Sequence, residues 1–320
     1  MSPARALVAP ASLKGVLSAR GAAAALADGF REAGVEADEC PVADGGEGTA
    51  EALSSVLGGI WREEPVADPL GRPVLARWLE LPDGTAVVEA SAAIGLGLVA
   101  PAELDPLRAS SRGLGELILA TDGRPLLVCL GGSATVDGGR GLRDVVPSLP
   151  SGTRVACDVD SPLLDAARVF ARQKGADDGA VAELERRLAA DVELAPYAEL
   201  PGAGAAGGLG AALASLGAEL VPGAGLVLDP VGFDGRLAGV AVVVTGEGTV
   251  DRTTREGKAP AEVARRAAAH GVECVVFGGV VVEPLPGAET VALSGDPARA
   301  RDDLRELGLA LGTRLLDAAR

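Results

Sequence analysis

The feature that most constrains the fold is a repeated order of apolar segment, glycine-containing loop and helical segment. Residues 5–9 are mostly apolar and predict a buried strand, and residues 19–33 carry apolar side chains at helical spacing. Ser18 is a suitable N-cap for that helix, and Gly34 suits the position just after its end. Strands that alternate with helices favour a mainly parallel sheet with helices on both faces.

The same order returns further along the chain. It predicts strands over residues 35–40, 125–130, 239–245 and 273–277, and helices over residues 49–57, 262–270 and 298–316. Residues 61–66, 73–81 and 85–90 instead read as ribbons joined by the turns DPLG and PDG. We therefore expect an α/β protein. Its Rossmann-like, mainly parallel-sheet domain, residues 1–58 and 239–320, is interrupted by a second α/β domain with a mixed sheet, residues 59–238.

The composition defines the core and excludes one class of partner. Apolar residues make up 48% of the 320-residue chain but aromatic residues only 2%, so the core must be built mainly from Ala, Val and Leu. The formal net charge is −16, and no basic stripe stands out against it. A polyanionic backbone would be repelled over most of the surface. We therefore do not expect a nucleic-acid partner.

Histidine and cysteine usage narrows the chemistry. The chain has one histidine, His270, which excludes Ser-His-Asp and Cys-His nucleophiles and multi-histidine metal sites. The four cysteines are far apart, without CxxC spacing, as is typical of reduced thiols in a cytoplasmic protein. No stretch is apolar and long enough to predict a membrane span. Acid–base chemistry is then left to carboxylates.

Lysine is scarce in this chain. Only three of the 29 basic residues are lysines, namely Lys14, Lys174 and Lys258, and each has a glycine neighbour. An ammonium is a compact charge with three donors, and it suits a phosphate oxygen that a glycine backbone approaches closely. We therefore expect the three lysines to serve a site rather than the general surface.

Glycine-rich loops and acidic residues accompany the lysines. The loops GGSAT at 131–135, GAGAAGGLG at 202–210 and TGEG at 245–248 could offer N–H groups to anionic oxygens, although none fits a P-loop or dinucleotide fingerprint. Nearby acids could hold Mg²⁺ through oxygen or act as a base. Phosphates, an oxygen-ligated metal, a carboxylate base and the lack of a catalytic histidine together favour phosphoryl transfer.

Seven segments occur in an order that resembles the bacterial glycerate kinase family. They are APASLKGVLSA, PVADGGEGT, LGGSATVDGG, CDVDSPL, RQKGA, PGAGAAGGLGAAL and TGEGTVDRTTREGKAP, and the resemblance runs from about residue 5 to the end. It implies an ATP- and Mg²⁺-dependent kinase of two α/β domains that phosphorylates D-glycerate, most often at the 2-hydroxyl. The motif lysines and acids of the family fall on Lys14, Asp44, Glu47, Asp137, Asp158, Lys174, Glu247, Asp251 and Lys258.

The spacing and the resemblance lead to hypotheses for each site residue. Lys14 and Lys258 would contact phosphate or the substrate carboxylate, and Asp44 or Asp251 would accept the proton of the attacking hydroxyl. Asp137 and Glu247 would hold Mg²⁺. The expected nucleotide-binding residues are Gly131, Gly132, Ser133, Lys174, Gly207, Gly208 and Gly246.

Two departures from the family pattern leave alternatives open. Ala11 stands where the family usually has an acid, and the segments before and after VACDV are shorter than usual. The alternatives are a kinase of another small 2-hydroxy acid and a non-catalytic nucleotide or metabolite binder. A homodimer is compatible with the sequence, and the choice between Asp44 and Asp251 as the base stays open.

Overall fold

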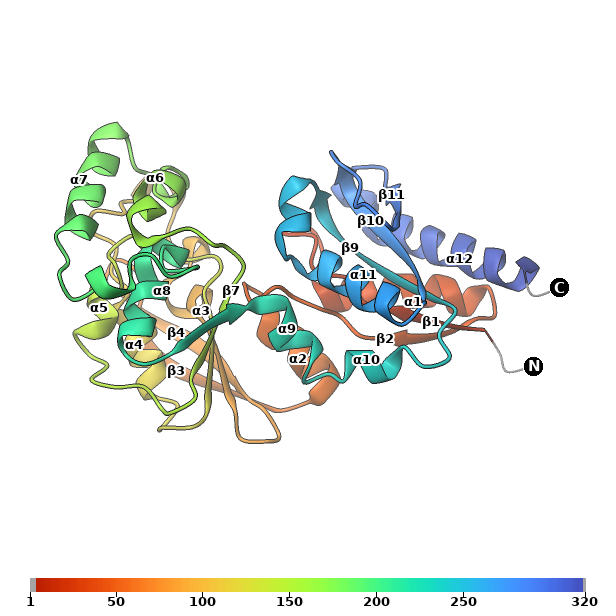
Figure 1. The fold of residues 1–320 in the computed structure, drawn as a ribbon, viewed down its shortest axis with the longest axis horizontal. Helices are drawn as coiled ribbons and strands as arrows, with labels where there is room; N and C mark the ends of the chain where they lie inside the picture. Colours follow the sequence, from red (N-terminus) through yellow and green to blue (C-terminus); the bar gives the residue numbers. More distant parts are fainter. Residues whose placement is uncertain (1–3, 319–320) are drawn as a thin grey trace. The chain divides into compact units, whose positions relative to one another are not determined.

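Strands and helices alternate along most of the chain, and the strands form two separate sheets. The computed structural model describes residues 4–318 and has the expected α/β fold (Figure 1). The described residues divide into two units. The first unit runs up to Asp44 and includes Glu51–Leu57 and the chain from Ala224 on; the second holds Gly45–Ala50 and Gly58–Gly223.

The sheet of the first unit has five strands in the order β11-β10-β9-β1-β2, and every neighbouring pair is parallel. Its strands are β1 (Arg5–Val8), β2 (Glu36–Glu39), β9 (Val242–Val250), β10 (Glu273–Val281) and β11 (Glu289–Ala292). Parallel sheets are usually covered on both faces. The central strands fit this rule, since Ala6–Val8, Val242–Val244 and Val275–Phe277 are fully buried.

Helix α1 shows how the sequence sets local structure in this unit. Ser18 caps its first turn by accepting from Gly21 N, and Gly34, just after its end, has φ +85°, so both predicted end signals are confirmed. The helix packs closely against α12, because a Cβ at Gly29 would lie 2.0 Å from the Arg305 carbonyl oxygen. Figure 1 shows the two helices side by side. The helices of this unit are α1 (Ala19–Glu32), α2 (Thr49–Leu57), α9 (Gly223–Leu228), α10 (Phe233–Arg236), α11 (Ala259–Ala269), α12 (Ala300–Ala318), η6 (Arg252–Glu256) and η7 (Pro297–Arg299), although the first residues of α2 and α9 fall in the second unit.

The sheet of the second unit is mixed, with six strands in the order β3-β4-β5-β6-β7-β8. The pairs β3–β4 and β4–β5 are antiparallel, as the turn signals predicted, and the following pairs are parallel. The strands are β3 (Ile60–Ala67), β4 (Pro73–Glu80), β5 (Ala86–Glu89), β6 (Leu126–Cys129), β7 (Arg154–Cys157) and β8 (Glu219–Pro222). The helices are α3 (Ala90–Ile94), α4 (Arg112–Leu119), α5 (Arg140–Arg143), α6 (Ala166–Phe170), α7 (Asp178–Ala189), α8 (Ala205–Ser215), η1 (Leu96–Leu98), η2 (Pro101–Glu103), η3 (Leu163–Asp165), η4 (Arg172–Lys174) and η5 (Ala195–Tyr197).

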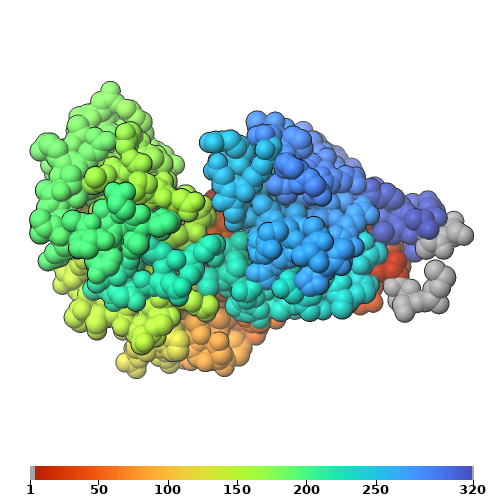
Figure 2. All heavy atoms as spheres, in the orientation of Figure 1, coloured from red at the N-terminus to blue at the C-terminus, as the bar shows by residue number. Residues whose placement is uncertain are grey.

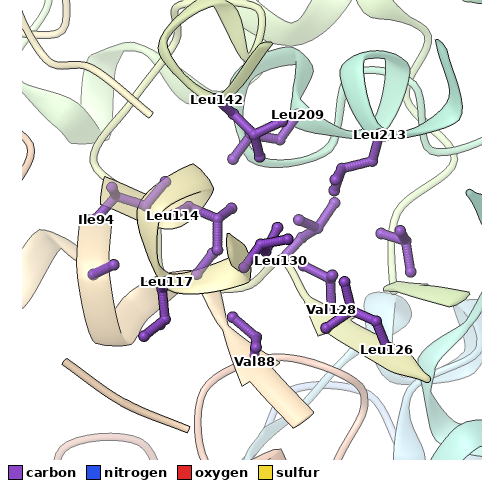
Figure 3. Close-up of a cluster of buried hydrophobic side chains, with 14 of the residues drawn as sticks. Val88, Ile94, Leu114, Leu117, Leu126, Val128, Leu130, Leu142, Leu209 and Leu213 are labelled. Carbon is purple, nitrogen blue, oxygen red and sulfur yellow. The ribbon is translucent and has the colours of Figure 1, made fainter. Parts of the chain in front are cut away.

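Aliphatic side chains build the core of each unit. In the second unit, Leu114 of α4 and Leu209 of α8 lie in one cluster with Val88 and Val128 from the sheet (Figure 3). The first unit has a separate cluster rich in Ala and Val, with Phe30 and Phe277 as its aromatic members. The prediction of a core built mainly from Ala, Val and Leu is therefore confirmed.

Two boundaries differ from the sequence prediction. Residues 224–238 belong to the first unit and not to the insertion, and Arg236 forms an ion pair of 2.8 Å with Asp38 of β2. Strand β9 continues past Thr245 to Val250, because it stays paired with β10 through Gly246 and Glu247. The TGEG segment is thus strand and not loop.

Three further findings concern the chain as a whole. Among the described residues, no helix combines the length and the apolar character that a membrane crossing needs. None of the four cysteines, all of which lie in that part, forms a disulfide, and burial raises the pKa of Cys40 to about 11. In the space-filling view of Figure 2, red N-terminal residues emerge beside the blue C-terminal ones, as the packing of α1 on α12 requires.

Candidate active site

A cavity of about 350 Å³ lies in the first unit at the carboxyl ends of its strands. The segments that follow β1 and β11 line it together with the ends of β9 and β10. Ligands of open α/β sheets bind at this edge. The cavity brings together four predicted site residues, Lys14, Glu247, Asp251 and Lys258.

Lys14 lies on a tight loop between β1 and α1. The loop closes on itself through bonds between the backbones of Leu13 and Leu17, and Gly15 takes the φ of +74° that the turn needs. A Cβ at Gly248 of β9 would lie only 3.6 Å from Leu13 Cα, so the loop rests against that strand. The ammonium of Lys14 is exposed at the cavity.

Glu247 is held between Thr254 and Lys258. Its Oε1 accepts a bond of 2.7 Å from the Thr254 hydroxyl, and its Oε2 lies 3.6 Å from Lys258 Nζ. Burial is the largest influence and raises the pKa of Glu247; the charge of Asp44 adds to this, while Thr254 and Lys258 oppose it. The site therefore contains a carboxylate that is desolvated but still next to a cation.

The two candidate bases stand in different environments. Asp251 caps η6: its Oδ1 accepts from Thr253 N at 2.8 Å and from the Thr253 hydroxyl at 2.6 Å. The bond from that hydroxyl is the main reason why the pKa of Asp251 is lowered. Asp44 is close enough to Glu247 for its charge to raise the pKa of Glu247.

One wall of the cavity includes an acid that the sequence analysis missed. Asp303 of α12 accepts a bond of 3.0 Å from Ser294 N and pairs with Arg299 at 3.2 Å. Burial alone would raise the pKa of Asp303, but the Ser294 bonds and Arg299 outweigh it and the net shift is downward. The signal was the SGDP sequence before the last helix, which places Ser294 and a turn next to the helix start.

In the second unit, the GGSAT loop follows β6 as predicted. Gly132 has φ +80°, and the loop is tied on one side by bonds from Leu96 N to Gly132 O and from Ala134 N to Ile94 O, both 2.8 Å. Within residues 4–318 no protein acceptor is found for the N–H groups of Gly131, Gly132 and Ser133. Successive free N–H groups of this kind suit an anion.

Two predicted ligand residues of the second unit are occupied by bonds within the protein. The Lys174 ammonium is buried and donates to Ser133 Oγ at 3.1 Å and to Thr135 O at 2.7 Å. The Asp137 carboxylate accepts four bonds, from the N–H and hydroxyl of Ser111 and from the N–H groups of Gly139 and Gly141. Both side chains fix backbone segments in this structure.

Three predicted nucleotide-binding glycines have packing roles. A Cβ at Gly246 would lie 2.2 Å from Phe277 O, and one at Gly207 would lie 2.2 Å from Thr135 O. Gly207 and Gly208 have φ of +78° and +96°, and both N–H groups donate to Gly204 O. A glycine is therefore needed at each position for close backbone contact, independently of any ligand.

A second missed residue, Glu89, ends β5. Its Oε1 accepts a bond of 2.7 Å from Ala50 N, and Gly48 N is a further donor to the carboxylate. Burial raises its pKa, and the charge of Glu47 adds to the effect. In the sequence, the signal that could have identified Glu89 is a single acidic residue after the apolar run AVV. Glu89 therefore anchors the predicted DGGEGT motif.

The described residues offer no ready-made metal cage. Within residues 4–318, no three His, Cys, Asp or Glu side chains are grouped as a metal ion would require. Mg²⁺ is commonly held by only one or two carboxylates, with phosphates and water completing its shell. Glu247, with Asp44 near it, provides a donor set of that kind.

The all-parallel sheet has a cavity at its carboxyl edge that contains lysines and carboxylates. This arrangement suits an enzyme that binds phosphorylated ligands. The comparisons with known proteins agree with this class. The family model described as the glycerate kinase family matches residues 6–146 and 143–293. The chain therefore belongs to the glycerate kinase family and is a phosphotransferase.

Individual relatives show how far the similarity extends. "Glycerate 2-kinase" of Escherichia coli (strain K12) is 39% identical over 81% of this chain and 80% of that protein. "Glycerate kinase" of Bacillus subtilis (strain 168) is 36% identical over 86% of this chain and 85% of that protein. A solved structure, putative glycerate kinase 2 from Salmonella typhimurium LT2, matches with a TM-score of 0.85 and 31% identity over 99% of this chain and 100% of that one.

Proposed function

We propose that this protein transfers the γ-phosphoryl group of ATP to D-glycerate, at the 2-hydroxyl. A kinase family implies ATP as the co-substrate, and the relatives named above carry glycerate in their names. The observation that supports the site is the cavity of the first unit, where Lys14 and Lys258 lie with Glu247 at the carboxyl ends of parallel strands. Glycerate and ATP are both anions, and two ammonium groups there offset a chain of net charge −16.

The attacking hydroxyl needs a base, and we assign this role to Asp44. Asp251 caps η6 through Thr253, and its lowered pKa makes it a weaker proton acceptor. In the proposed reaction the 2-hydroxyl oxygen forms a bond to the γ-phosphorus, its proton passes to Asp44, and the bond to the ADP oxygen breaks. Lys14 and Lys258 neutralise the charge that develops on the phosphoryl oxygens.

Magnesium fits the residues of the first unit in part. Glu247 would supply a carboxylate oxygen, and ATP phosphates and water would complete the shell. A bound Mg²⁺ would add charge neutralisation at the phosphates. We do not propose Asp137 as a metal ligand, because four hydrogen bonds within its own unit already occupy its carboxylate.

Of the residues predicted to bind the nucleotide, we retain those of one loop. We propose that the free N–H groups of Gly131, Gly132 and Ser133 contact phosphate oxygens. Gly207, Gly208 and Gly246 instead serve close backbone packing. We also propose that the two units are two domains and that the second interrupts the first; limited proteolysis with mass spectrometry of the fragments would test this.

A coupled assay of ADP release, run with a panel of hydroxy acids, tests the proposal against its alternatives. We expect D-glycerate to give the highest kcat/KM, with turnover abolished by chelation of Mg²⁺. A higher kcat/KM for another 2-hydroxy acid would assign a different acceptor. ATP binding without turnover on any acceptor would instead indicate a non-catalytic nucleotide binder, which is the alternative based on Ala11 and the shortened segments.

A further inference from the structure

Lys174 is a buried ammonium whose hydrogen-bond acceptors are neutral groups. Lys174 is only 2% exposed, and its Nζ donates to Ser133 Oγ and Thr135 O. The Phe170 ring centroid lies 6.0 Å from Nζ. Within the described chain, no carboxylate lies at ion-pair distance from it. Burial lowers the pKa of Lys174 to about 7, while the charge of Asp137 opposes the shift. A desolvated charge of this kind is costly unless its hydrogen bonds are satisfied.

Both acceptors of Lys174 belong to one short loop. Ser133 and Thr135 are part of the segment 131–135, which bonds to residues 94–96 through Ala134 N and Gly132 O. The loop is thus held by backbone bonds to one segment and by the ammonium from another, since Lys174 ends η4. Between these restraints lie the N–H groups of Gly131 and Gly132, for which no protein acceptor is found in residues 4–318.

A direct chemical role for Lys174 does not agree with its burial. A lysine next to a serine is also the composition of a Ser-Lys dyad. Ser133 is only 3% exposed and Lys174 only 2%, so an external substrate reaches neither the hydroxyl nor the amine. The bonds of Lys174 therefore act on the shape of the loop and not on a ligand.

We propose that Lys174 is a positioning residue, whose buried ammonium fixes the backbone of residues 131–135 so that the free N–H groups of the loop stay aimed at nucleotide phosphates. The nucleotide part rests on the proposed function; the ordering of the loop does not. Lys174 acts through the backbone, which explains how it can be buried and still affect nucleotide binding.

The test compares Lys174→Met with Thr135→Val in the full-length protein. The Thr135 hydroxyl is buried without a partner among the described residues, and Lys174 uses the Thr135 carbonyl, so valine leaves the Lys174 bonds in place. Hydrogen exchange without nucleotide should become about 10- to 100-fold faster at Ala134 and Leu96 in Lys174→Met, as expected for the loss of two buried hydrogen bonds. Thr135→Val should keep wild-type exchange at both amides.

Kinetics separate positioning from general stability. In Lys174→Met the KM for ATP should rise about tenfold or more while the KM for D-glycerate stays within about twofold. Unchanged exchange at Ala134 and Leu96 would overturn the proposal. Equally faster exchange throughout the second unit would also overturn it, because the role would then be structural only. Should Lys174→Met not fold, Ser133→Ala removes one acceptor and should still accelerate exchange at these two amides more than Thr135→Val; equal rates would overturn the proposal.

The two proposals can fail separately. If the wild type transfers no phosphoryl group to D-glycerate while exchange responds as described, the ordering role of Lys174 stands and the proposed function is wrong. If the wild type is active and Lys174→Met keeps both its exchange and its KM for ATP, the positioning role is wrong and the function stands.

Discussion

The two units use the same residue type in opposite ways. In the first unit, Lys258 is a quarter exposed and lies 3.6 Å from Glu247 in a cavity, and Lys14 is exposed beside it. In the second unit, Lys174 is buried and bonded to a hydroxyl and a backbone carbonyl. The contrast shows that the few lysines of this chain have specific local roles. Their burial decides whether the ammonium can contact a ligand or only forms bonds within the protein.

The largest effect should follow from removing a ligand-facing ammonium. Lys258→Ala should lower kcat about 10²- to 10³-fold, the usual loss for one preorganised group that stabilises transition-state charge. The folded state should persist, as measured by urea unfolding. Arg265→Ala on α11, the helix that begins just after Lys258, is the control: the Arg265 side chain is mostly exposed, and its pair with Glu262 contributes less than about 1 kcal/mol. Equal kcat in the two variants would remove Lys258 from the reaction.

The next prediction separates glycines that pack from glycines that leave space. Gly246→Ala puts a Cβ 2.2 Å from Phe277 O and should destabilise the protein by about 3 kcal/mol, near the top of the range for overpacking. Gly248→Ala, two residues along β9, meets its nearest atom at 3.6 Å and should cost less than about 1 kcal/mol. Denaturant midpoints measure both. Similar midpoints would contradict the packing role of Gly246.

A third prediction concerns the pH dependence that Lys174 introduces. Its pKa is lowered from 10.5 to about 7 on folding, so between these values the unfolded chain binds more protons than the native one. Stability should therefore rise with pH across this window, by up to about 1.4 kcal/mol per pH unit, and be independent of this group below it. The difference between wild type and Lys174→Met, from urea unfolding at pH 6 to 9, isolates the contribution. A flat difference would contradict the lowered pKa of Lys174 in the native state.

The smallest effect is expected at Glu89. Glu89→Gln keeps an oxygen that can accept from Ala50 N and removes the charge next to Glu47, so stability should change by less than about 1 kcal/mol. Glu89→Ala leaves the N–H groups of Gly48 and Ala50 without that acceptor and should cost about 1–3 kcal/mol. Equal stability of the two variants would show that the carboxylate does not anchor this segment.

Local signals predicted the fold well and the roles of single residues less well. The strand–helix order, the Ser18 cap, the turn at Gly34 and the antiparallel ribbons were readable, because each depends on neighbours in sequence. The continuation of β9 was not, because pairing with β10 outweighs the low strand preference of Gly246 and Gly248.

The site was predictable as a group of residues and not as a set of contacts. The cavity joins Lys14, Glu247 and Lys258, which the spacing had singled out. The acceptors of Lys174 lie 41 and 39 residues away, at Ser133 and Thr135, and the Asp137 carboxylate depends on Ser111, which is 26 residues away. Such partners follow from the tertiary structure, so no local pattern shows them.

Phosphorus NMR of a mixture of D-glycerate, ATP and Mg²⁺ with the wild-type protein tests the central claim most directly, with Lys258→Ala run in parallel. The account predicts a phosphomonoester on the 2-hydroxyl of glycerate with the wild type, and a rate at least about 100-fold lower with the variant. Absence of any phosphoglycerate with the wild type, or the same rate with both proteins, would contradict it.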